Sequence, residues 1–267
     1  MLKAISFLLV APAVSGLILF SAGPALAEDE TAATAADEPV VLDGVETAEP
    51  TALPSNFGLW WRGWRERVSL ALTFDSVKKS EKALLFAEER VRLADYITQN
   101  ADDPKIQEKA QQMLAKANQY MEKIQERQSD LINNGGERAK ILLGNLAAHY
   151  ANQERVMEKL EDKLPPEKLE QFQSSRRSAE ARTEAFLSRL AEHQNVPAEV
   201  KEKIIRTKER VGEKLKAREE FRTEQKDILE KIRAGSQAAR EELKQLRERK
   251  IKSLNRLNQI GEENSGQ

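Results

Sequence analysis

The chain has 267 residues, of which 43 are Lys or Arg and 44 are Asp or Glu, so its formal net charge is −1. A third of the residues are charged, 5% are aromatic and none is cysteine. High charge with few aromatic residues is typical of long helices and coiled coils. The absence of cysteine excludes disulfides, thiol nucleophiles and cysteine-ligated metals. We therefore predict an all-α protein, an elongated bundle of five to seven helices with coiled-coil-like hairpins.

Residues 1–27 have the pattern of a secretory signal peptide. Lys3 precedes an apolar run over residues 4–20, and the small residues Ala25 and Ala27 form an A-x-A cleavage site. We expect cleavage after Ala27 and an exported protein, either periplasmic, on the cell surface or extracellular. The alternative is an uncleaved membrane anchor, because the apolar run approaches the ~20 residues that a span requires.

Residues 28–54 read as an acidic, disordered linker. They contain eight acidic residues, no basic residue and no aromatic residue. Such a segment buries too little apolar surface to offset the entropy lost on ordering. Weak docking of Val40, Val41 and Leu42 on the rest of the protein is the alternative. Two helical parts follow: a bundle over residues 55–195 and long basic helices over residues 196–267.

A first helix starts near Ser55 or Asn56, both of which are good N-caps. Its apolar residues recur every three or four positions, which puts them on one face: Leu59, Trp60, Trp64, Val68, Ala71 and Leu72. Either Trp60 and Trp64 cap the core and leave only Trp61 exposed, or the cluster is a surface that contacts a membrane or a partner groove. The candidate contact surface consists of Trp60, Trp61, Arg62, Trp64 and Arg65.

The sequence Thr73-Phe74-Asp75 ends this helix. Asp75 is expected to cap the next helix, with Phe74 as its hydrophobic staple. Further helices are expected over residues 76–99, from Pro104 to about 133, over 137–163, and from Pro166 to about 195. From residue 197 to about 260 the pattern is helical again, with a break at Gly235-Ser236.

No motif indicates catalysis. The only two histidines, His149 and His193, lack partners at metal-ligand spacing and are expected to be neutral surface residues. Paired carboxylates such as Glu88-Glu89 alternate with bases and are expected to be solvated. There is no glycine-rich phosphate loop and no nucleophile elbow. We predict no enzyme activity, no cofactor and no metal site.

Nucleic-acid binding is also disfavoured. The basic C-terminal helices contain no aromatic residue after Phe221, whereas a nucleic-acid surface would interleave aromatic and basic residues. An anionic envelope polymer, an unknown protein or a second copy of the chain are the partners that remain, and membrane contact is possible.

The segment from Leu53 to Asp95 resembles a known family. It contains a leucine-proline pair, a tryptophan- and arginine-rich helix, Leu-Thr-Phe-Asp at 72–75, Lys78-Lys79 and Ala-Glu-Glu-Arg at 87–90. This combination is similar to exported bacterial helical domains of unassigned function, domain of unknown function 5667. The resemblance implies a helical exported domain and no activity.

The leading hypothesis is a non-catalytic scaffold or adaptor that acts through helical contacts in the cell envelope or outside the cell. One alternative is a periplasmic, chaperone-like holdase. The other is a membrane-surface binder, which requires Trp61 and its neighbours to be exposed.

Overall fold

The computed structural model describes residues 39–134 and 136–265, all of which belong to one compact unit, Ala35–Gln267. The predicted signal peptide with its expected cleavage residues Ala25 and Ala27, and residues 28–38 of the acidic segment, lie outside the described residues. Within the described ranges there are eight helices and no strand, which confirms the all-α prediction. The helices are α1 (Asn56–Ala71), α2 (Ser76–Asn100), α3 (Pro104–Gln125), α4 (Gln128–Asn134), α5 (Gly136–Lys163), α6 (Pro166–Glu192), α7 (Ala198–Arg233) and α8 (Ala238–Ser265).

The helix count exceeds the expected five to seven because the expected third helix is interrupted. The backbone N–H of Arg127 donates to the carbonyl of Ile124, three residues back, and the Arg127 guanidinium donates to the carbonyl of Lys123. This tightened turn separates α3 from α4. No glycine or proline marks the interruption, so the apolar pattern runs through it.

Side-chain caps set the starts of the first three helices, as the sequence predicts for Ser55 and Asp75. Ser55, Asp75 and Asp103 each accept a hydrogen bond from a backbone N–H in the first turn of the following helix, at 3.0, 2.7 and 2.8 Å. These bonds satisfy amides that have no partner inside the helix. The expected break before α8 is also confirmed: Gly235 has a φ of +90°, and Ser236 Oγ accepts from the N–H of Ala239 at 3.3 Å.

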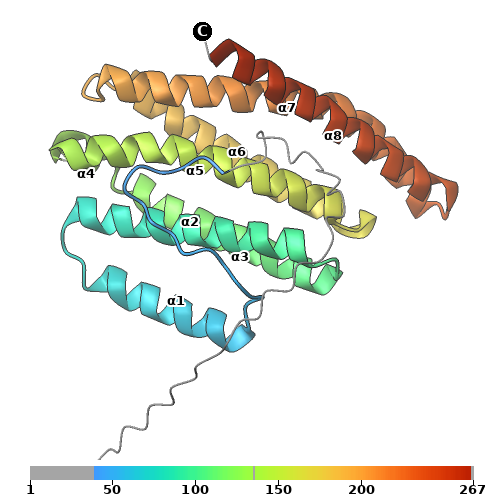
Figure 1. Ribbon diagram of the computed structural model, residues 1–267, viewed down its shortest axis with the longest axis horizontal. Helices are drawn as coiled ribbons and strands as arrows, with labels where there is room; N and C mark the ends of the chain where they lie inside the picture. The colour runs from blue at the N-terminus through green and yellow to red at the C-terminus, as the bar shows by residue number, and fades with distance from the viewer. Residues whose placement is uncertain (1–38, 135, 266–267) are drawn as a thin grey trace, which may run out of the picture. The chain divides into compact units, whose positions relative to one another are not determined.

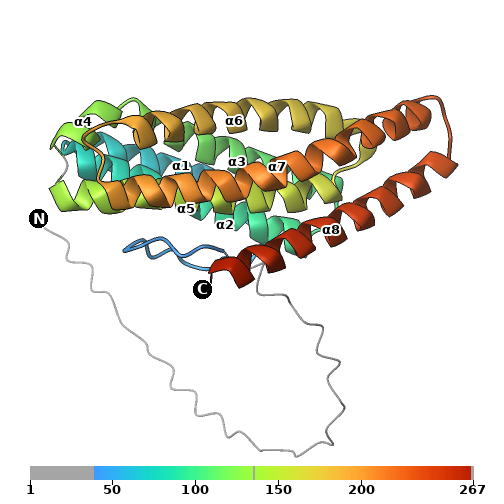
Figure 2. The same ribbon diagram turned by 90° about the horizontal axis from the view of Figure 1, so that it is seen from above.

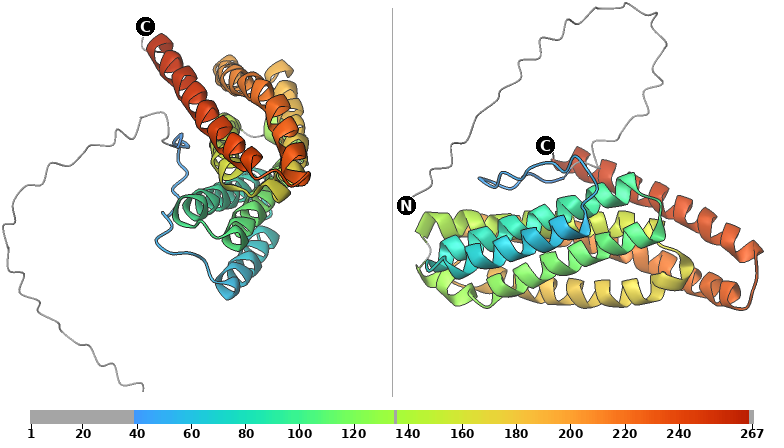
Figure 3. Two further views of the ribbon diagram at one scale, coloured as in Figure 1. Left: turned by 90° about the vertical axis from the view of Figure 1, so that its right-hand side faces the viewer. Right: turned by 90° about the horizontal axis from the view of Figure 1, so that it is seen from below.

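The helices pack in sequence across the bundle. α2 packs against α3 and α5, α5 against α6 and α7, and α7 against α8. Figure 1 shows α1 on one side of this array and α7 and α8 on the other. Figure 2 shows α7 and α8 joined by a short turn at one end. In the end-on view of Figure 3, α1 lies at the rim, and its main neighbour is α2.

Residues 40–45 are held against α5 rather than solvated. The side-chain amide of Asn152 accepts from the N–H of Val40 (2.7 Å) and donates to its carbonyl (2.8 Å), and Asn145 does the same for Asp43 (2.9 and 2.8 Å). Leu42 between them is 3% exposed. The expectation of a solvated tether is therefore wrong for residues 40–45. The alternative, docking, is correct there, because the side chains of Asn145 and Asn152 hydrogen-bond backbone groups that would otherwise lose their water partners.

Candidate functional site

Helix α1 has a narrow side that faces the bundle and a broad apolar side that faces solvent. With about 3.6 residues per turn, Leu59, Glu66 and Leu70 share the inner side, where Glu66 and Leu70 are buried. The opposite side consists of Phe57, Trp60, Trp61, Trp64 and Val68, which are 73%, 62%, 49%, 48% and 36% exposed. We call these five residues the aromatic face.

The rings of the aromatic face form one continuous cluster. The centroids of Phe57 and Trp60 are 5.9 Å apart, those of Trp60 and Trp61 are 6.3 Å apart, and those of Trp61 and Trp64 are 5.1 Å apart. The last pair is stacked, with an interplanar angle of 19°. The rings therefore keep one another in place while their outer surfaces stay open.

The expectation that Trp60 and Trp64 cap the core is wrong. A buried ion pair instead holds the opposite side of α1, which carries Glu66, against the bundle. Arg90 of α2 donates to both carboxylate oxygens of Glu66, at 2.9 and 2.8 Å, and the hydroxyl of Tyr120 of α3 donates to Glu66 Oε2 at 2.5 Å. Glu66 is 1% exposed. A buried charge must keep its partner, so Glu66 faces inward and the tryptophans face outward.

The arginines of α1 lie at the borders of the aromatic face. Arg62 reaches Glu89 of α2 at 3.6 Å, whereas Arg65 and Arg67 have no carboxylate within ion-pair distance among the described residues. By helical period, Arg62 and Arg65 follow one edge of the face and Arg67 follows the other. The candidate arginines Arg62 and Arg65 thus stay beside the tryptophans, as the sequence suggests.

The three residues after α1 have different roles. Thr73 is buried and donates to the carbonyl of Ser69 at 2.7 Å. Asp75 caps α2. Phe74 is 93% exposed, so it is no hydrophobic staple; its ring instead adds apolar surface near the C-terminal end of α1, beside the 70%-exposed Leu72.

A groove runs beside the aromatic face, between α1 and α3. Its volume is about 480 Å³. Its lining includes Trp60, so the groove adjoins the aromatic face directly, and Arg90 and Tyr120 lie among its innermost residues. Lys116 and Lys123 of α3 lie along its other side. This groove could not be predicted from the sequence, because nothing local links residue 60 to residues 112–123.

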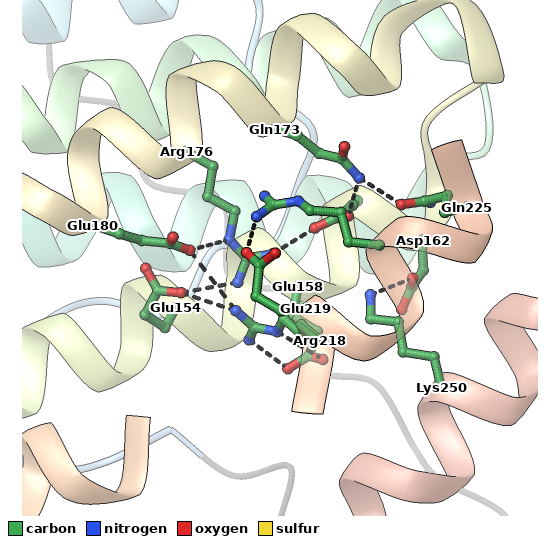
Figure 4. A network of polar contacts seen from close by, with 12 residues as sticks. Glu154, Glu158, Asp162, Gln173, Arg176, Glu180, Arg218, Glu219, Gln225 and Lys250 are labelled. Atoms are coloured by element: carbon green, nitrogen blue, oxygen red, sulfur yellow. Dashed lines mark hydrogen bonds and ion pairs between the residues drawn. The ribbon is translucent and has the colours of Figure 1, made fainter. Parts of the chain in front are cut away.

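A second polar centre joins α5, α6 and α7 (Figure 4). The guanidinium of Arg176, on α6, contacts Glu154 Oε2 at 2.9 Å, Glu161 Oε2 at 2.6 Å and Glu180 Oε1 at 2.7 Å. Arg176 is 3% exposed. One buried cation therefore holds three carboxylates from two helices.

Arg218 of α7 and Lys250 of α8 extend this network. Arg218 contacts Glu158 at 2.9 Å and Glu154 at 3.2 Å, and Lys250 contacts Asp162 at 2.9 Å. These contacts join α5 to α6 through Arg176, to α7 through Arg218 and to α8 through Lys250.

Burial and neighbouring charges give the acids of this network very different pKa values. Burial raises the pKa of Glu161, but the charge of Arg176 and then of Lys250 outweighs it and holds the pKa at about 2. Burial, followed by the negative charge of Glu154, raises the pKa of Glu180 to about 7. Oε1 of Glu154 is buried without a hydrogen-bond partner. The neighbouring Glu154 favours a proton on Glu180, since two adjacent carboxylates do not readily both ionise.

The expectation of a solvated Glu88 and a surface His149 is wrong. His149 is fully buried, and its Nδ1 lies 2.7 Å from Oε2 of Glu88, which is 1% exposed. Asn152 donates to the other oxygen of Glu88 at 2.8 Å. His193 is half-buried and accepts from the N–H of Asn195. Among the described residues no group of three or more acids or histidines is placed to hold a metal ion.

Comparison with known proteins identifies one family. Residues 51–167 match the model of a domain of unknown function (DUF5667). This part of the chain is a DUF5667 domain. No curated protein and no solved structure matches the chain.

The DUF5667 domain spans α1 to α5 and ends as α6 begins. It contains the aromatic face, the Glu66–Arg90–Tyr120 contacts and the groove. The acids of α5 in the second centre belong to the domain, whereas Arg176 and Arg218 come from helices beyond it. Within the part of the chain that the structure describes, no helix combines the length and the apolarity needed to cross a membrane.

Proposed function

We propose that this chain is an exported, non-catalytic protein that binds a membrane surface through the aromatic face of α1. The observation that carries the proposal is the orientation of α1: all three tryptophans of the chain lie on one side of one helix and are about half exposed. A soluble surface rarely leaves so many adjacent rings uncovered.

The chemistry of α1 favours a lipid interface over a protein groove. Interfacial helices carry Trp, Phe and Leu on one face and basic residues at its borders, and tryptophan is enriched at the headgroup level. The aromatic face has this composition, with Arg62 and Arg65 on one border and Arg67 on the other. Helix α1, which carries this face, lies at the rim of the bundle (Figure 3), where a flat surface can reach it.

The available apolar surface is large enough for reversible binding. A half-exposed aromatic ring offers roughly 100 Å², so four rings offer roughly 400 Å², or about 10 kcal/mol as an upper bound at 25 cal/mol per Å². Ordering and desolvation consume much of this gain. The remainder supports a peripheral protein that binds and releases.

The test is co-sedimentation of residues 28–267, which keep the whole compact unit, with vesicles of phosphatidylcholine and phosphatidylglycerol. Trp61→Ala is compared with wild type and with Ile205→Ala, which removes a 45%-exposed apolar side chain on α7. Loss of roughly 100 Å² predicts that the binding free energy of Trp61→Ala falls by about 2.5 kcal/mol, or roughly 70-fold in affinity. Ile205→Ala should bind like wild type.

Two results would overturn the proposal. If wild type binds no vesicle, α1 is no membrane contact, and suppression of client aggregation near stoichiometric ratio would point to a holdase instead. If Trp61→Ala and Ile205→Ala weaken binding equally, the contact is elsewhere, and a scaffold that acts through other helices becomes the better account.

A further inference from the structure

We infer that the groove between α1 and α3 binds the phosphate headgroup of an anionic phospholipid, with an acyl chain lying along the side formed by Leu59, Trp60 and Met113. This inference rests on the proposed function and names the lipid class that the same helix selects.

The rim of the groove carries positive charge without matching negative charge. Arg67 of α1 and Lys116 and Lys123 of α3 line it, and none of the three has a carboxylate within ion-pair distance among the described residues. The Nζ of Lys116 donates to the side-chain oxygen of Gln119 at 3.0 Å. A smaller groove shares Arg67 and Lys123 and adds two bases, Lys79 and Arg127, against a single exposed acid, Glu126.

The inner part of the groove does not neutralise this rim. The one acid there, Glu66, already binds Arg90 and the hydroxyl of Tyr120. Burial and the bond to Glu66 raise the pKa of Tyr120, so this phenol stays neutral. Burial, followed by the charges of Arg127 and Arg67, lowers the pKa of Lys123. A bound anion would relieve that crowding of cations.

The apolar part of the groove would contact the acyl chain of the lipid. Leu59 and Trp60 on α1 and Met113 and Ala115 on α3 line it, and Gly63 leaves space because no atom lies within 4 Å of where a Cβ would stand. The volume of about 480 Å³ lies within the usual range of ligand sites. Trp60 belongs to both groove and aromatic face, so a lipid in the groove stays continuous with a membrane below that face.

The test uses soluble, short-chain lipids, because they need no membrane insertion. Isothermal titration of residues 28–267 compares dihexanoyl phosphatidylglycerol, dihexanoyl phosphatidylcholine and inorganic phosphate, all below micelle formation. The anionic lipid should bind at least about 10-fold more tightly than either of the others. Lys123→Gln should weaken that binding about 5- to 10-fold. Lys105→Gln, which removes an exposed base at the start of α3, should leave it unchanged.

Each other result overturns the inference. If the two lipids bind equally tightly, the positive rim does not select the ligand. If inorganic phosphate binds as tightly as the anionic lipid, the apolar side contributes nothing to binding. Failure of the groove is separable from failure of the membrane proposal. Vesicle binding without short-chain lipid binding refutes only the groove, and short-chain lipid binding without vesicle binding refutes only the membrane contact.

Discussion

Replacing Arg176 by methionine removes one cation that three carboxylates share. The change leaves Glu154 and Glu161, which are 3% and 7% exposed, inside the bundle with part of their compensation lost. Glu154 keeps Arg218 at 3.2 Å, and Glu161 keeps the amide of Gln173 at 2.7 Å. Removing one partner of a buried ion pair costs about 3–5 kcal/mol. At about 2–4 °C per kcal/mol for a unit of this size, Tm should fall by roughly 6–20 °C.

The control is the neighbouring residue of the same type. Arg177 is exposed on α6, and Arg177→Met should change the free energy of unfolding by no more than about 0.5 kcal/mol. Both variants are measured by urea unfolding at pH 7 with circular dichroism at the helix band. The loss of unfolding free energy in Arg176→Met, relative to wild type, should be smaller at pH 5, because a buried carboxyl without its arginine takes up a proton more readily. Equal midpoints for the two variants would refute the reasoning.

Two further predictions concern Glu180 and Glu66. Folding raises the pKa of Glu180 from 4.5 to about 7. The stabilisation that results is fully present below pH 4.5 and is lost as the pH rises through 7, so wild-type Tm should fall between pH 5 and pH 8. Glu180→Gln should flatten this fall and the exposed Glu184→Gln should not; equal slopes for both would contradict the assignment. Glu66→Ala should remove hydrogen-exchange protection from the amides of α1 while α5 to α7 keep theirs, because only Glu66 and Leu70 of α1 are buried. Unchanged protection of α1 would mean that apolar contacts alone hold it.

Helix starts were predictable because their signals are local. A cap such as Asp75 or Asp103 bonds an amide two or three residues away. Leu84 and Val91 lie seven residues apart, which puts them on one side of α2, and both are buried. The break before α8 needed only Gly235, whose left-handed backbone favours glycine.

The orientation of α1 was not predictable, because it is decided by distant residues. Glu66 binds Arg90, 24 residues away, and Tyr120, 54 residues away. Without those partners, the widest apolar stripe of a helix is expected to face inward. The same holds for Arg176 and Glu154: charges at helical spacing look solvated unless the tertiary partners are known. The candidate contact residues lie together on α1, but the exposure of Trp60 and Trp64 could not be predicted from the sequence.

The central claim, that the aromatic face of α1 enters a membrane interface, is tested most directly by tryptophan fluorescence. Trp60, Trp61 and Trp64 are the only tryptophans of the chain, so the emission reports on this face alone. On adding vesicles to residues 28–267, we predict a blue shift, protection from acrylamide, and quenching by lipids brominated near the headgroup end of the acyl chain. Emission and acrylamide quenching that do not change while vesicles are in excess would contradict the claim.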